Sequence, residues 1–155
     1  MKEILLLLHP TFGVLGIIAA VWVIVEVINS SQSNQSRIRI ASVMIFILMV
    51  LTWITGGYFY VFYYAADKAI ILNGPWPFAH SLLMESKEHI FFMTLVLSAF
   101  LPIVSRMKNI ITSRQTRILI ISTATLIVIS GLALEGAGAI IAAGAKLGLL
   151  QTVVQ

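Results

Sequence analysis

The sequence predicts an all-α integral membrane protein, an up-and-down bundle of four transmembrane helices with both termini on the outer side. Apolar residues make up 59% of the 155 residues and charged residues only 10%, and the mean hydropathy is +1.01. A soluble chain of this size would have too little polar surface to cover itself. Four long apolar runs alternate with short polar segments, without the ten-residue alternation of a membrane β-barrel.

Each apolar run is long enough to form one transmembrane helix. A helix needs about 20 residues to cross a hydrocarbon layer of about 30 Å, so the longer runs are expected to tilt or protrude. No internal repeat and no soluble domain is visible, and residues 1–155 are expected to form a single domain. The predicted helices cover residues 4–29, 40–66, 82–105 and 118–145.

The basic residues predict the orientation. Six of them lie in the two loops that follow the first and third helices, and four lie on the opposite side. Because loops rich in lysine and arginine stay on the inner side, both termini are expected outside. The inner set is Arg37, Arg39, Arg106, Lys108, Arg114 and Arg117, and the outer set is Lys2, Lys68, Lys87 and Lys146.

Composition also excludes several classes of function. The chain has no cysteine, so it has no disulfide, no thiolate ligand and no thiol nucleophile. Its net charge of +4 comes from residues scattered over short loops, which does not indicate nucleic-acid binding. No Ser-His-Asp set, phosphate-binding loop or nucleotide fingerprint occurs, so an electron-transfer or metal-binding role is favoured over a hydrolase or transferase.

All three histidines and most of the acids fall at one end of the predicted bundle. Ionisable groups are unfavourable in lipid and usually mark a site, a relay or a partner. Threading the helices up and down brings these positions to the outer face, where we expect a cluster at the extracytoplasmic side of the cell membrane. Its candidate members are His9, His80, Glu85, Glu88, His89 and Glu135.

The first interpretation of this cluster is one heme b. His9 and His89 lie at similar depth near the outer ends of the first and third helices, as bis-imidazole ligation requires. Gly13 and Gly16 follow His9 on the same helical face and allow close approach of a helix or a flat macrocycle. A heme in an apolar pocket suits electron transfer, here with quinol or an outer-face redox partner.

A resemblance supports this interpretation over two of the helices. Leu8-His9-Pro10 followed by Gly13 resembles the first helix of small four-helix membrane cytochromes of the b561-like kind, and His89 matches a second-ligand position. The b561-like proteins proper use four histidines for two hemes on opposite faces. This chain has three histidines, none near the inner face, so the resemblance implies at most one heme.

Two other classes use the same residues. Imidazole and carboxylate groups suit copper, zinc or iron without porphyrin, and the metal ligands would come from His9, His80, Glu85, Glu88, His89 and Glu135. Alternatively, the protein is a cofactor-free membrane subunit, or a small carrier with a proton-titrating histidine–carboxylate cluster. Small residues at Gly138, Ala142, Ala143 and Gly144 predict helix packing, within the bundle, in a homo-oligomer or in a larger complex.

An aromatic segment follows the second helix. Tyr58, Tyr60, Tyr63 and Tyr64 precede Gly74-Pro75-Trp76-Pro77, and aromatic side chains of this kind settle at the headgroup level. The two prolines stiffen the segment, which is expected to be either an ordinary interfacial turn or a lid over the histidine site.

Overall fold

The structure, a computed structural model, describes residues 1–29, 31–107, 110 and 112–154 and is helical throughout its regular parts. Four of its helical segments are long and apolar enough to cross a membrane, which confirms the predicted all-α architecture. The elements are α1 (Lys2–Ile28), η1 (Gln32–Asn34), α2 (Gln35–Phe62), α3 (Tyr64–Asn73), η2 (Ala79–Met84), α4 (Glu85–Val104) and α5 (Arg114–Val154).

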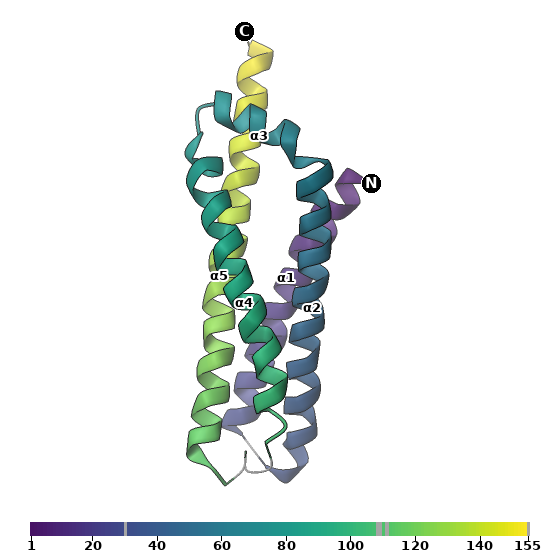
Figure 1. Ribbon diagram of the computed structural model, residues 1–155, viewed down its shortest axis with the longest axis vertical. Helices are drawn as coiled ribbons and strands as arrows, with labels where there is room; N and C mark the ends of the chain where they lie inside the picture. Colours follow the sequence, from purple (N-terminus) through teal and green to yellow (C-terminus); the bar gives the residue numbers. More distant parts are fainter. Residues whose placement is uncertain (30, 108–109, 111, 155) are drawn as a thin grey trace.

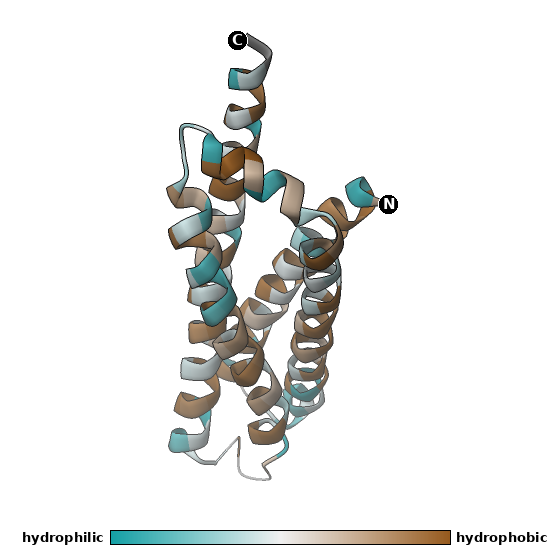
Figure 2. Ribbon diagram, turned by 45° about the horizontal axis from the view of Figure 1, so that its top comes forward, coloured by the Kyte–Doolittle hydropathy of each residue, from teal (hydrophilic) through white to brown (hydrophobic). Residues whose placement is uncertain are grey.

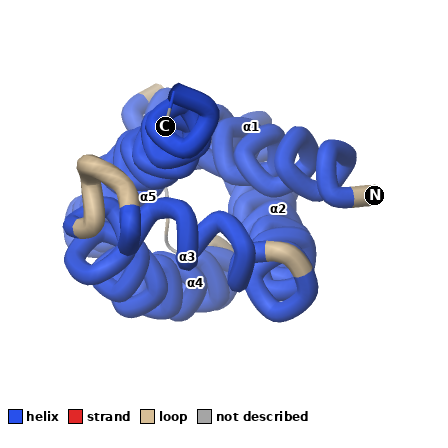
Figure 3. The backbone as a smooth tube through the Cα atoms, turned by 90° about the horizontal axis from the view of Figure 1, so that it is seen from above, coloured by secondary structure: helices blue, strands red, loops and turns tan. Residues whose placement is uncertain are grey.

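The long helices form a ring in which α1 packs on α2, α2 on α4, α4 on α5 and α5 on α1. They run alternately down and up, so the N- and C-termini lie at the same end (Figure 1). Seen along the bundle, α3 crosses that end between α2 and α5 (Figure 3). The third membrane-spanning segment begins with η2, a six-residue π-helical stretch that continues without a break into α4.

The helices are hydrophobic on nearly every side (Figure 2). Large aliphatic residues such as Ile18, Ile54, Val96 and Ile129 point outward, as lipid contact requires. Small and hydroxyl residues face inward, where they let helix backbones approach closely. The buried inward set includes Ala19, Ala20, Ala41, Ser42, Thr94, Ser98 and Ala124.

Two separate apolar cores hold the bundle together. The larger core lies towards the basic loops and joins all four long helices through residues such as Val23, Ile45, Leu101 and Ile127. The smaller core gathers Tyr64, Ile71, Ala79 and Ile141 beneath α3. The ionisable residues described below lie between these two cores.

The segment after the second helix differs from the prediction. The helix does not continue to Ala66, because Tyr63 breaks it with φ −128° and ψ −25° and α3 begins in a new direction. The following turn lies on α5, where the Cα of Gly148 is 3.1 Å from the place a Cβ of Gly74 would occupy. A Cβ on Gly144 would similarly contact Ala79, so the small residues of α5 receive this segment within the same chain.

The opposite end is tied by polar contacts. Glu26 is buried and accepts a hydrogen bond of 3.0 Å from the Trp22 indole, while Arg37 lies 3.5 Å from the same carboxylate oxygen. Arg39 donates to the carbonyl oxygen of Ser105 at 3.3 Å, which joins α2 to the end of α4. Ser30 and Lys108, two members of the predicted inner loops, lie outside the described residues.

Candidate functional site

His9 is fixed inside the bundle by a backbone contact. It lies one turn before Gly13 on the inward face of α1, and its Nδ1 donates to the Thr52 carbonyl oxygen of α2 at 2.9 Å. The same carbonyl oxygen also accepts a hydrogen bond of 3.2 Å from the Thr55 hydroxyl of its own helix. The bond from His9 sets the ring orientation and leaves Nε2 for a further partner.

Lys87 and Glu135 join His9 from two other helices. Lys87 enters from the first turn of α4 and Glu135 from the middle of α5. The lysine interacts electrostatically with both His9 and Glu135. No direct ion pair links Lys87 to Glu135 in the described part of the chain, so the two charges are near one another without being in contact.

Each of these three groups lies against a glycine of a neighbouring helix. A Cβ on Gly13 of α1 would collide with the Glu135 carboxylate, and a Cβ on Gly56 of α2 would lie 2.5 Å from the His9 ring. On α5, a Cβ on Gly138 would lie 2.9 Å from the Lys87 nitrogen. The helices therefore leave room for three polar head groups by omitting three side chains.

The three residues of the cluster line a small, partly open cavity. Its volume is about 20 Å³, enough for one water molecule, since a site needs roughly 10–15 Å³ for one. His9, Lys87 and Glu135 line it together with mostly apolar residues. A water there would have the several polar partners that buried waters require. The remaining lining residues are Gly13, Ile17, Met49, Thr52, Phe91, Gly131 and Leu134.

The other residues predicted for the heme and metal sites lie elsewhere. Glu85, Glu88 and His89 are all exposed on α4, and His89 Nδ1 donates to the Glu85 carbonyl oxygen of its own helix at 2.7 Å. The reason is helical register: neighbouring residues are about 100° apart, so His89 is about 200° away from Lys87. The structure thus brings Glu135 to His9 and leaves His89 on the outside of the bundle.

This arrangement does not assemble the predicted cofactor sites. Among the described residues, no group of three His, Cys, Asp or Glu side chains is close enough to hold a metal ion, so the expected six-ligand set does not form. Gly13 and Gly16, expected beside a macrocycle, instead receive the side chains of Glu135 and Met49. Binding of heme or metal stays a prediction that this geometry does not support.

His80 belongs to a second polar site under α3. It is buried, and its Nδ1 shares a hydrogen bond of 3.0 Å with the Tyr64 hydroxyl. The Tyr64 ring stacks on Tyr60 with a centroid separation of 5.2 Å. Burial, followed by the neighbouring Tyr60 and the carboxylates of Asp67 and Glu88, raises the pKa of Tyr64 to about 12. This pair locks α3 onto η2.

Lys87 is the site residue that sequence reasoning missed. It was counted only as one of the outer basic residues. A signal was present, because Lys87, Phe91, Thr94, Ser98 and Leu101 follow each other at spacings of three and four and form one face of α4. The small hydroxyl residues of that face are typical of a helix interface inside a membrane bundle.

Comparison with protein-family models, with curated proteins and with solved structures finds no match to this chain.

Proposed function

We propose that this chain is an integral membrane protein whose functional group is the His9–Lys87–Glu135 cluster, and that the cluster binds and releases a proton in a small carrier or membrane subunit. One observation carries the proposal: an imidazole, an ammonium group and a carboxylate from three helices face one water-sized cavity inside an apolar bundle. Such groups are rare within membrane spans and are usually functional.

Proton exchange fits this set of groups better than a closed structural ion pair. A carboxylate, an imidazole and an amine each hold or release a proton, and a water between them connects groups that do not touch. Lys87 interacts electrostatically with both His9 and Glu135. Protonation of one group of the cluster therefore changes the proton affinity of the others.

The depth of the cluster supports exchange with one side of the membrane. By a rise of about 1.5 Å per residue, Glu135 is about 32 Å along α5 from Arg114, and Lys87 is about 26 Å from Val104. Both values approach the roughly 30 Å thickness of the hydrocarbon core. The cluster would thus be near the boundary opposite the basic loops, within reach of water from that side. The charge distribution of the loops favours an extracytoplasmic location for that side and for both termini.

Infrared spectroscopy of the protein in lipid nanodiscs tests the proposal. In a pH titration, the C=O band of protonated Glu135 should appear and disappear reversibly in the wild type and be missing from Glu135→Gln, so the difference between the two titrations separates it from the bands of the five other acidic side chains. Lys87→Met should move the midpoint of that titration, because it removes the nearest positive charge. Lys146→Met, which removes an exposed lysine from the same end of the bundle, is the matched control and should leave the midpoint unchanged.

The result would count against proton exchange if the wild type and Glu135→Gln showed the same titrating carboxyl bands, or if Lys146→Met moved the midpoint as far as Lys87→Met. A cluster with a purely structural role would reveal itself differently. Glu135→Gln would then lower the melting temperature, while no titrating carboxyl band would distinguish the wild type from this variant.

One observation keeps a redox function as the second candidate. His9 donates through Nδ1 to a backbone carbonyl, which is how metal- and heme-ligating imidazoles are commonly oriented. If His9 and His89 ligate one heme, protein from heme-replete cells should show a Soret band and reduced α and β bands that either alanine variant abolishes. His80→Ala should leave these bands intact. Colourless protein without stoichiometric copper, zinc or iron would eliminate this candidate.

A further inference from the structure

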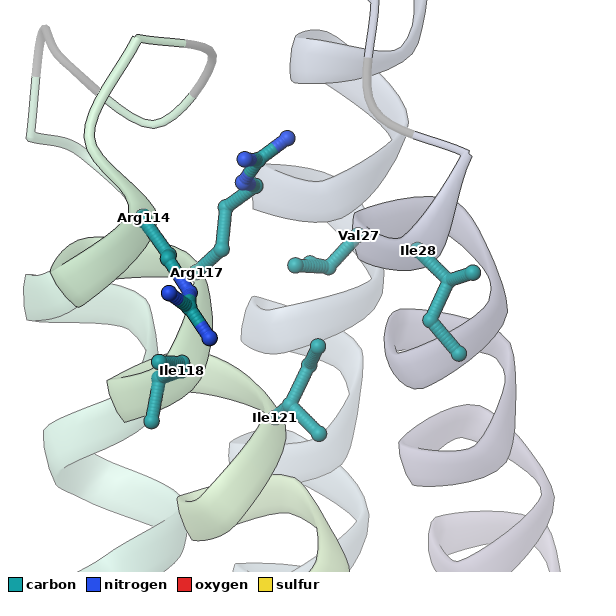
Figure 4. A pocket seen from close by; sticks show the side chains of 6 residues that line it. All are labelled: Val27, Ile28, Arg114, Arg117, Ile118 and Ile121. Atoms are coloured by element: carbon teal, nitrogen blue, oxygen red, sulfur yellow. The ribbon is translucent and has the colours of Figure 1, made fainter.

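A second pocket opens at the other end of the bundle, between the end of α1 and the start of α5. Its volume is about 210 Å³, compared with about 20 Å³ for the cavity at the cluster. Figure 4 shows six side chains around it, from residues at the end of α1 and in the first turns of α5. They are Val27, Ile28, Arg114, Arg117, Ile118 and Ile121.

The lining combines two guanidinium groups with four aliphatic side chains. Arginine presents a planar fork of N–H donors that matches the oxygens of a phosphate, and it binds them more specifically than a lysine does. Arg114 and Arg117 both line this pocket, so its lining carries positive charge on the side where the basic loops gather.

The position of the pocket decides between a soluble anion and a lipid. Ile28 and Ile118 are strongly exposed on the outer surface of the bundle, at 65% and 51%, so the pocket adjoins the surface that faces the hydrocarbon. A free phosphate would make no use of these aliphatic side chains. The acyl chains of a phospholipid would run along them while its phosphate lay against the arginines.

We propose that this pocket binds the headgroup of an anionic phospholipid at the inner boundary of the membrane. The proposal rests on the membrane location argued above, but not on proton exchange at the cluster. Basic pockets between transmembrane helices on the side of the positive loops bind such headgroups, each basic residue contributing about 1 kcal/mol. At that value, loss of one arginine weakens binding about fivefold, and loss of both weakens it roughly thirtyfold.

The test measures lipid binding by native mass spectrometry of the full chain, with phosphatidylglycerol and phosphatidylcholine titrated separately. Phosphatidylglycerol should bind more tightly to the wild type, and Arg114→Gln combined with Arg117→Gln should remove roughly thirtyfold of that affinity. Arg106→Gln is the matched control, since Arg106 is exposed at the same end and does not line the pocket. The Arg→Lys pair keeps both charges and should lose less than the Arg→Gln pair.

Three outcomes would overturn the proposal: equal binding of the two lipids, unchanged binding in the Arg→Gln pair, or an equal loss in Arg106→Gln. Competition with inorganic phosphate distinguishes a lipid site from a site for a soluble anion. If millimolar phosphate displaces phosphatidylglycerol completely and raises the melting temperature as much as the lipid does, the site belongs to a soluble anion. If the chain is extracted from membranes by alkaline carbonate, the membrane location fails as well. A failure of lipid binding alone leaves the titration of Glu135 unaffected, which keeps the two proposals separate.

Discussion

Replacing Gly56 by alanine places a methyl group against the imidazole of the cluster. A Cβ at this position would lie 2.5 Å from Cε1 and 2.6 Å from Nδ1 of His9. The ring is rigid, and its Nδ1 is 2.9 Å from the Thr52 oxygen, so it cannot move away without losing that hydrogen bond. We therefore expect Gly56→Ala either to rotate the His9 ring or to separate α1 from α2.

Three contributions determine how far Gly56→Ala lowers the free energy of unfolding. Overpacking of a tight interior costs about 1–3 kcal/mol, and loss of the His9 hydrogen bond adds about 1 kcal/mol. Alanine recovers about 1 kcal/mol through its higher helix propensity than glycine. The free energy of unfolding should fall by about 1–3 kcal/mol in Gly56→Ala.

The adjacent glycine supplies the control. A Cβ on Gly57 would meet nothing within 4 Å, so Gly57→Ala should leave stability unchanged or raise it by up to about 1 kcal/mol. Unfolding of both variants in the same detergent, followed by circular dichroism, measures the difference. Equal effects of the two substitutions would refute the argument. In a His9→Ala background, Gly56→Ala should lose most of its effect, because the atoms it collides with are gone.

Three further predictions follow from other contacts. Because the pKa of Tyr64 is raised from 10.0 to about 12, the folded chain keeps a proton that the unfolded chain releases, so stability should fall as pH rises from about 10 to about 12. Thermal melts across this pH range should show a smaller loss of stability in Tyr64→Phe, which lacks the titrating hydroxyl. Thr94→Val removes a 2.9 Å hydrogen bond between α4 and α5, and melting should show a loss of about 0.6 kcal/mol, with no change contradicting the bond. Since the chain has no native cysteine, cysteine at Ser36 should react only with reagent from inside intact cells and cysteine at Asn73 only from outside, whereas the reverse would refute the orientation.

The helices were predictable from the sequence because hydrocarbon imposes a simple rule on length and polarity. Runs of about 20 apolar residues must be helical to satisfy their backbone in lipid, and the charged loops between them limit their ends. Local geometry at the membrane surface is less constrained. There water satisfies the backbone as well, so composition did not indicate that the chain bends at Tyr63 and forms α3.

The candidate site was predictable in part. His9 and Glu135 stand out because their sequence neighbours are almost entirely apolar, and the structure does bring both to one cavity. The sequence neighbours do not show which of the polar residues at the start of α4 faces the cavity. Four of five consecutive residues there are ionisable, so only the register of the helix decides which of them faces inward.

That register also separates the two functional candidates, although both use His9. Thr94 and Ser98 are buried, and the Thr94 hydroxyl donates to Ser130 of α5, so the face that contains Lys87 is fixed inward by contacts well below it. Bringing His89 to a heme with His9 would require α4 to rotate by about 200°. That rotation would turn both hydroxyl residues to lipid and bury Val96 and other large aliphatic side chains where small ones now pack. A proton site at Lys87 needs no such rearrangement, and for this reason we propose the cluster, and not His9 together with His89, as the functional group of the bundle.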